Sequence, residues 1–228
     1  MSISTSPPSP PPPKKRGLGC LGCGCLILAL IVVLVLGLLG AGGYFFYTKG
    51  LEFTSTKAAS IPPFNGDDGF YQGVKQKIAD FDHDLKAHQS ATIRLNGDEI
   101  NAVLGRDPYL SAHQVHLFVS IVNDQAFMQG SLPMSVNPLT QALFSGRYLN
   151  FDGAFGLDFN SGNKSLNLIL HRLQVGDQTV PDNSISVLQS EFTPILNAEL
   201  QKDPDSKSLM DQAKSIRLEN GELVIETQ

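Results

Sequence analysis

Hydrophobic residues gather first in an uncharged run from Gly17 to Thr48. Within it, Leu26 to Leu39 reads LILALIVVLVLGLL, in which all but Ala29 and Gly37 are Leu, Ile or Val. Each such residue near a bilayer centre favours insertion by roughly 0.5 kcal/mol, so the run favours insertion by about 6 kcal/mol. Cys25 to Tyr47 is long enough to cross a hydrocarbon core of about 30 Å as a helix. We therefore predict one transmembrane helix.

Apolar residues at helical spacing follow in the rest of the chain. They predict an amphipathic helix over 69–88, whose inner face consists of Phe70, Val74, Ile78, Phe81 and Leu85. Asn96 followed by Glu99 has the form of a capping box and predicts the start of a second, short helix. Asn183 is expected to cap a third helix that Pro194 kinks or limits. Residues 205–214 are expected to form a last short helix.

Alternating apolar and polar residues predict strands in the middle and at the end of the chain. The clearest alternation lies in 148–160, where every second residue from Leu149 to Phe159 is apolar or Gly. This period, with one apolar side, is typical of a sheet that is wet on one face. A phase shift near His171-Arg172 predicts a bulge in the next strand, and Asn220-Gly221 predicts a closing hairpin. Further strands are expected at 92–95, 115–121, 126–135 and 165–175.

These patterns together predict an α+β fold. One N-terminal transmembrane helix precedes a curved antiparallel sheet of five to seven strands, with helices packed on one face of the sheet. The chain then divides into a disordered Pro-rich cytoplasmic tail (1–16), a Cys/Gly-rich segment with the transmembrane helix (17–48), an extended tether (49–66) and an extracytoplasmic α+β domain (67–228).

Charge sets the expected orientation of the transmembrane helix. Lys14, Lys15 and Arg16 precede it without any acidic residue, whereas the chain from Lys49 onward holds 14 basic and 22 acidic residues, a net charge of −8. The positive-inside rule then predicts a single-pass protein of the cytoplasmic (inner) membrane, with a cytoplasmic N-terminus and an extracytoplasmic C-terminal domain. Gly37 and Ala41 form a small-xxx-small pair, on which we base the prediction of a homodimer through the span.

A cleaved signal peptide is the alternative to a retained anchor. Its apolar region is about 7–15 residues long, which is shorter than the run seen here. The small residues Ala41, Gly42 and Gly43 would nevertheless suit a signal peptidase. The length of the apolar run favours the retained anchor.

All three cysteines, Cys20, Cys23 and Cys25, lie where the chain enters the predicted span. The outer domain has none, so its fold uses no disulfide. The three are candidate lipidation sites, because cysteines beside a span are common acceptors of palmitate. A metal site is a weaker interpretation, since no His or fourth Cys lies nearby. Small residues that are merely tolerated at a helix end are the third interpretation.

Titratable residues suggest no catalytic or metal-binding site. In the Asp80–Asp84 segment, Asp80 and Asp84 share a helical face while Asp82 and His83 point elsewhere. His113 and His116 have no carboxylate motif beside them. The sequence also lacks a P-loop, a G-x-S-x-G elbow and a G-x-G-x-x-G loop. We therefore predict no cofactor, and the acidic outer domain argues against nucleic acid as a partner.

An apolar stripe on the predicted sheet is the candidate ligand site. It could line a groove for an acyl chain beside the membrane. The alternative is an ordinary core face under the helices, which a domain of this size needs. The candidate groove residues are Val115, Leu117, Val119, Phe151, Phe155, Phe159, Leu166 and Leu168.

Three short segments resemble a known family. TIRLNGDEINAVL (92–104) looks like the strand and LN-containing helix that open extracytoplasmic domains of bacterial single-pass proteins of the YpmS-like family. LQVGDQTVP (173–181) is similar to the "vG…vP" step of that family, and SIRLENGELVI (215–225) to the final hairpin of related lipid-transfer-like domains. The resemblance covers roughly residues 70–225 and implies a bacterial host. It brings no established activity, and lipid binding would follow by analogy of fold alone.

The sequence therefore predicts a membrane-anchored, non-enzymatic binding or scaffolding protein of the cell envelope. Its expected partners are the membrane bilayer and either a lipid ligand or an envelope protein. The alternative is a hydrolase-like envelope enzyme, with a site assembled from scattered Asp residues and His113, His116 or His171. Converging histidines and carboxylates would favour the enzyme.

Overall fold

The computed structural model describes residues 52–64, 66–136 and 144–228. The predicted span, the Pro-rich tail and the three cysteines lie outside these residues. Among the helices within them, none combines the length and the apolar content that crossing a bilayer requires.

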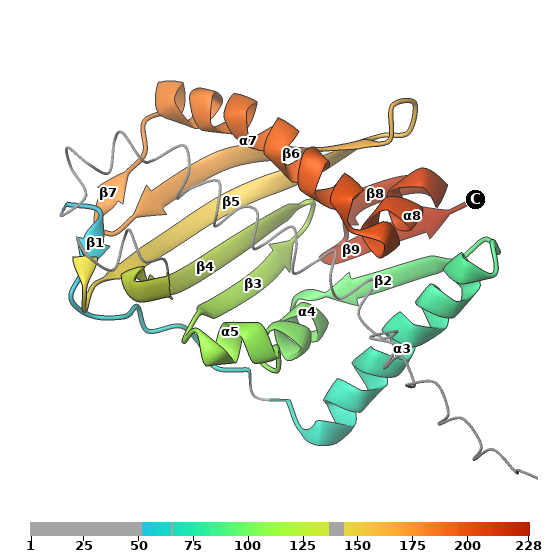
Figure 1. The fold of residues 1–228 in the computed structure, drawn as a ribbon, viewed down its shortest axis with the longest axis horizontal. Coiled ribbons are helices and arrows are strands. Elements are labelled where there is room, and N and C mark those ends of the chain that lie inside the picture. Colours follow the sequence, from blue (N-terminus) through green and yellow to red (C-terminus); the bar gives the residue numbers. More distant parts are fainter. Residues whose placement is uncertain (1–51, 65, 137–143) are drawn as a thin grey trace, which may run out of the picture.

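The strands of the described residues form two antiparallel sheets (Figure 1). The larger sheet has six strands in the order β3-β4-β5-β6-β7, with β1 paired to β5, and the smaller has the order β2-β9-β8. Their bounds are β1 Thr54–Ser55, β2 Thr92–Asn96, β3 His116–Val122, β4 Gln125–Pro133, β5 Tyr148–Asn160, β6 Ser165–Val175, β7 Gln178–Thr179, β8 Ala213–Glu219 and β9 Glu222–Thr227.

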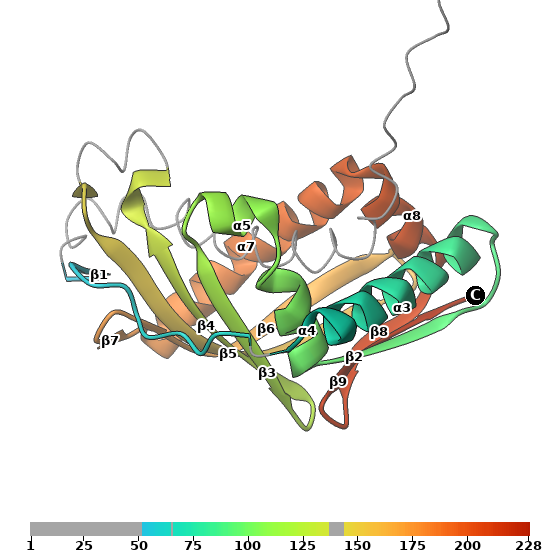
Figure 2. The same cartoon turned by 90° about the horizontal axis from the view of Figure 1, so that it is seen from below.

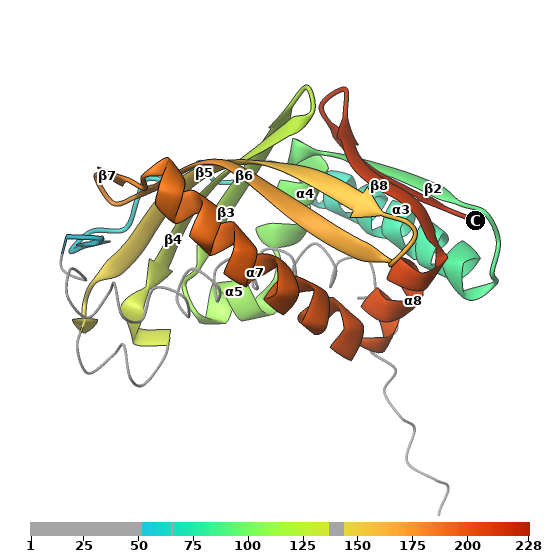
Figure 3. The ribbon, with the colours of Figure 1, turned by 90° about the horizontal axis from the view of Figure 1, so that it is seen from above.

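The α+β class and the antiparallel pairing are confirmed, but the single expected sheet is two. β2 pairs along its whole length with β9, from Thr92 opposite Glu226 to Asn96 opposite Glu222. It therefore joins the closing hairpin of β8 and β9 rather than the larger sheet. Figure 3 shows the larger sheet bending over α7, which lies on its concave side.

The helices gather on one side of the larger sheet (Figure 2). They are α3 Asp68–Lys86, α4 Gly97–Leu104, α5 Pro108–Ala112, α7 Asp182–Lys202 and α8 Pro204–Gln212, with a 3₁₀ turn η1 at Met134–Val136. The capping box at the start of α4 is present, since Asn96 Oδ1 accepts from the Glu99 N–H at 2.9 Å and Glu99 accepts from the Asn96 N–H at 3.0 Å. The expected helices at 69–88 and 205–214 correspond to α3 and α8.

One expectation about a helix cap is wrong, and one short helix was not predicted. α4 is followed by the separate helix α5, which begins at Pro108, where the missing N–H of proline costs no hydrogen bond. Asn183 does not cap α7, because the cap position is Pro181 and no side chain bonds there. α7 continues through Pro194 to Lys202.

The predicted bulge and the closing hairpin are both present. Ala154 of β5 pairs with Arg172, whereas the next residue, Phe155, pairs with Leu170, so His171 is the extra residue of β6. Asn220 and Gly221 both have positive φ, at 54° and 83°, as a type I′ turn requires.

Residues 52–64 form an N-terminal strap that is bonded to the larger sheet. The sequence predicts an extended tether over 49–66. Within this range, Thr54 and Ser55 pair with Leu149 and Tyr148 of β5 as strand β1. Asn150 then accepts from the Ala59 N–H at 3.0 Å and donates to the Lys57 carbonyl at 3.0 Å. The strap thus runs along the sheet before α3 begins, as Figure 2 shows.

Candidate functional site

Strand register places the candidate groove residues on one face of the larger sheet. Leu117 pairs with Gly130, and Gly130 pairs in turn with Phe151, so the three form one row across the sheet. Phe159 pairs with Leu166 at the far end of β5. Because side chains alternate along a strand, the other candidates on these strands share this face. The expected gathering of apolar residues on one side is therefore present.

Burial divides the eight candidates into two groups of four. Val119, Phe151, Leu166 and Leu168 are at most 5% exposed and belong to the core. Val115, Leu117, Phe155 and Phe159 are half-buried and pack against it. The first group is enclosed by the protein itself, so surface that a ligand could cover remains only on the second group.

Three further half-buried residues on this face did not enter the sequence prediction of the groove. Ile121 pairs with Ala126, whose other partner is Phe155, and Phe155 pairs with Leu170. Leu157 lies on the same face between Phe155 and Phe159. The alternation in β3, β5 and β6 already carried the signal for all three residues. Leu170 continues the period of Leu166 and Leu168, because the bulge at His171 shifts the phase of β6 only after it.

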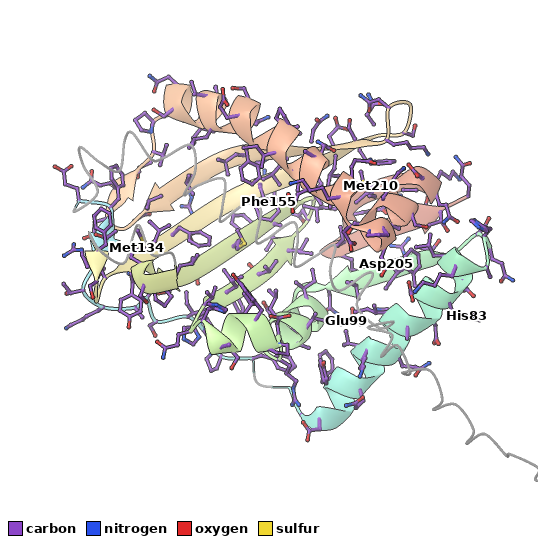
Figure 4. All side chains as sticks on the ribbon, viewed as in Figure 1. His83, Glu99, Met134, Phe155, Asp205 and Met210 are labelled. Carbon is purple, nitrogen blue, oxygen red and sulfur yellow. The ribbon has the colours of Figure 1, made fainter. Side chains whose placement is uncertain are left out.

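Helices flank this face on both sides. α7 packs along β6, and α4 packs on β3. Among the described residues, no helix crosses the middle of β4 and β5 (Figures 1 and 3). Figure 4 shows Phe155 in this region, between α7 on one side and α4 with α5 on the other. We call the half-buried residues of this region, namely Leu117, Ile121, Phe155, Leu157, Phe159 and Leu170, the apolar face.

Two asparagine side chains attach the flanking helices to the sheet. Asn101 of α4 donates to the Val119 carbonyl at 2.7 Å and accepts from the Val119 N–H at 2.8 Å. Asn197 of α7 makes the same pair of bonds with Leu166 of β6, at 2.9 and 2.8 Å. Each amide therefore takes the place of a neighbouring strand at an edge of the sheet.

Gly130 allows an aromatic ring to lie flat on the sheet. A Cβ at this position would lie 2.1 Å from Cε1 and Cζ of Phe151 and 2.9 Å from Cδ2 of Leu117. The ring of Phe151 therefore occupies the space above Gly130. This contact explains why Phe151, a groove candidate, is part of the core.

The opposite face of the larger sheet carries charged and amide groups. Asp152 of β5 pairs with Arg172 of β6 and accepts from Gln129 Nε2 at 3.2 Å. Ser131 donates to Asn150 Oδ1 at 2.8 Å. Charged and amide groups thus interrupt the apolar residues of this face, such as Phe118, Phe127 and Ile169, whereas the helix side carries the continuous apolar row.

The structure does not bring the histidines together. His116 lies on β3 and His171 on β6, with two strands between them. His113 Nδ1 lies 2.8 Å from the Tyr109 carbonyl, and His88 Nδ1 lies 3.2 Å from Gln212 Oε1. Within the described residues, no group of three or more His, Cys, Asp or Glu side chains is arranged to hold a metal ion.

A charged network covers part of the smaller sheet. Arg217 of β8 donates to Glu226 Oε1 of β9 at 2.8 Å and to Glu219 Oε2 at 3.1 Å. The bond from Arg217, supported by one from Ser215, lowers the pKa of Glu226 below its ordinary value. The same bond to Glu226 raises the pKa of Arg217. The network pairs one guanidinium with two carboxylates, and it lies on the smaller sheet rather than on the apolar face.

Comparisons with protein-family models, with characterised proteins and with solved structures give no match to this chain. The resemblance to the YpmS-like family therefore stays a prediction.

Proposed function

We propose that this chain is a membrane-anchored, non-enzymatic binding protein of the cell envelope whose apolar face takes an acyl chain. The observation that carries the proposal is the set of half-buried apolar residues of β3, β5 and β6, flanked by α7 and α4. An envelope protein that covers the same face is the other outcome that the experiment below distinguishes.

The chemistry of this face favours an apolar ligand. Its exposed area comes from Leu, Ile and Phe side chains, which offer no hydrogen bond to a polar ligand. Covering about 200 Å² of such surface would contribute about 5 kcal/mol to binding. A flexible hydrocarbon chain fits a curved face of this kind, because it needs no fixed set of polar contacts.

The predicted anchor supplies the reason for an acyl chain rather than another apolar ligand. The span, with its cytoplasmic N-terminus, would hold the domain beside the outer surface of the inner membrane. Lipid acyl chains are then the most abundant apolar molecules within reach. The tether is also short, since β1 begins at Thr54.

Photo-crosslinking tests the proposal with the full chain. The protein is reconstituted into phospholipid vesicles in which one lipid carries a photoreactive group on an acyl chain, and crosslinked peptides are mapped by mass spectrometry. We expect crosslinks in the segment that holds Phe155, Leu157 and Phe159. Phe155→Ser should weaken this labelling about tenfold, the loss expected from one phenylalanine contact.

Phe127→Ser is the matched control. Phe127 pairs with Ala154 and so lies on the opposite face of the same sheet. Its substitution should leave the labelling of the apolar face unchanged. Crosslinks that are confined to residues 17–48, or an equal loss in both variants, would contradict lipid binding and favour a protein partner.

A further inference from the structure

We infer that the end of the larger sheet at which β1 pairs with β5 faces the bilayer. This inference rests on the anchor that the proposed function includes. It adds the surface that meets the lipid headgroups, namely the edge formed by β1, the start of β5, the end of β4 and the turn before β7.

The position of the N-terminal strap identifies this end. Thr54 and Ser55 pair with Leu149 and Tyr148, the first residues of β5. Pro133, the last residue of β4, pairs with Tyr148 as well. The chain therefore reaches the larger sheet at one end of its long strands.

The turn between β6 and β7 lies at the same end. The Gly176 N–H donates to the Asn150 carbonyl at 2.7 Å. A Cβ on Gly176 would lie 3.5 Å from the carbonyl oxygens of Glu52 and Phe53. The first described residues of the chain thus lie beside this turn, whose next residue is the exposed Asp177.

Side-chain bonds keep the strap in place. Arg147 Nε donates to Thr54 Oγ1 at 2.6 Å, and its Nη2 donates to the Thr54 carbonyl. The Asn150 side chain accepts from the Ala59 N–H and donates to the Lys57 carbonyl on the face opposite the apolar face. Because these bonds attach the strap to the larger sheet at Thr54, the sequence between the predicted span and this attachment is shorter than the expected tether of 49–66.

The reach of that connection is short compared with the sheet. Thr54 follows Tyr47, the end of the predicted span, by seven residues. Seven extended residues reach at most about 25 Å. The ten residue-to-residue steps of β5 from Asn150 to Asn160 extend about 33 Å away from the end where the strap pairs with β5. The hairpin between β5 and β6 should therefore stand farther from the bilayer than the turn at Asp177.

Fluorescence resonance energy transfer from a dye on the protein to dyes on the lipid headgroups tests this orientation with the full chain. Cys20, Cys23 and Cys25 are first replaced by Ser, so that one introduced cysteine carries the donor dye. Asp177→Cys reports on the end of the sheet where β1 pairs with β5, and Ser161→Cys reports on the hairpin between β5 and β6. Both positions are exposed turn residues. The vesicles are phosphatidylglycerol and phosphatidylethanolamine with an acceptor dye on a fraction of the headgroups.

We expect transfer from Asp177→Cys to be at least about twofold higher than from Ser161→Cys, because about 33 Å of strand separates the two levels. Equal transfer, or higher transfer from Ser161→Cys, would overturn the orientation while leaving the anchor intact. Flotation of the same vesicles separates the two proposals. A chain that does not float with them lacks the anchor, and both the proposed function and this orientation then fail.

Discussion

Arg217 illustrates how single residues stabilise the smaller sheet. Its guanidinium bonds to Glu226 on the neighbouring strand and to Glu219 on its own strand. Arg94 lies on β2, the other neighbour of β9, and its Nη1 is 3.5 Å from Glu222 Oε2. Exposed pairs of this kind contribute little singly, but a guanidinium shared by two carboxylates is better ordered than an isolated pair.

The stability that Glu226 contributes should depend on pH. Its pKa is lowered in the folded protein, first by the bond from Arg217 and then by the bond from Ser215. A lowered folded pKa adds stability above the unfolded value of about 4.3, and this contribution disappears as the pH falls through the folded pKa. Glu226→Gln should therefore unfold more easily than the unsubstituted protein at pH 7, and the difference should vanish in acid.

Urea unfolding followed by circular dichroism between pH 7 and pH 3 measures this difference. Glu191→Gln on the exposed side of α7 is the matched control, because no hydrogen bond or ion pair is found for Glu191 within the described residues. The same pH dependence in both variants would show that the bond from Arg217 does not stabilise the fold.

At the scale of elements, side-chain amides decide how the helices dock. β3 and β6 each expose backbone groups toward a helix, and Asn101 and Asn197 bond to those groups. Gln189 of α7 adds a bond from the Leu170 N–H at 3.3 Å. Helices that cover sheet edges in this way prevent further strands from pairing there.

Removal of one such amide should be costly. Asn101 is 4% exposed, and Asn101→Ala leaves both backbone groups of Val119 without their partner. Each unsatisfied buried group costs about 1–3 kcal/mol, so for two groups we expect a loss of about 2–6 kcal/mol in the free energy of unfolding. Urea unfolding of the purified chain measures it.

Asn183→Ala is the control for this loss. Asn183 is exposed in the first turn of α7 and does not cap it, so its substitution should change stability by less than about 0.5 kcal/mol. A small loss for Asn101→Ala, or a loss near 1 kcal/mol for Asn183→Ala, would contradict the contacts described here.

The sequence predicted the elements better than their partners. The helix over 69–88, the capping box at Asn96 and the bulge at His171 depend on nearby residues, and all three are present. The pairing of β2 with β9 joins Thr92 to Glu226, and no local pattern specifies such a distant partner. Asn183 had the form of a cap, but the extended backbone of Pro181 starts the helix two residues earlier.

For the candidate site as well, the sequence predicted the local pattern but not the contacts between distant residues. Alternation in β5 placed Phe151, Phe155 and Phe159 on one face, as the register confirms. It gave no information on burial, because the Phe151 ring lies over Gly130 of the neighbouring strand. The strap was likewise hidden, since the bond from the Ala59 N–H ends on Asn150, 91 residues later.

At the scale of the whole molecule, the chain combines a predicted span, a short connection and a domain whose apolar face lies among helices. The strap ties the domain within about 25 Å of the predicted end of the span. The apolar face and the face with the charged and amide groups lie on opposite sides of one sheet. A ligand drawn from the bilayer would therefore find the continuous apolar row only on the side that the helices flank.

Native mass spectrometry of the released domain tests the central claim most directly. A protease site placed after Tyr47 lets the full chain fold and bind in the membrane, and cleavage then removes the span with its surrounding lipid. We predict that the released domain carries additional mass that corresponds to an acyl lipid, and that Phe155→Ser loses this mass while Phe127→Ser keeps it. A released domain that shows only its own mass would contradict the proposal that the apolar face holds an acyl chain.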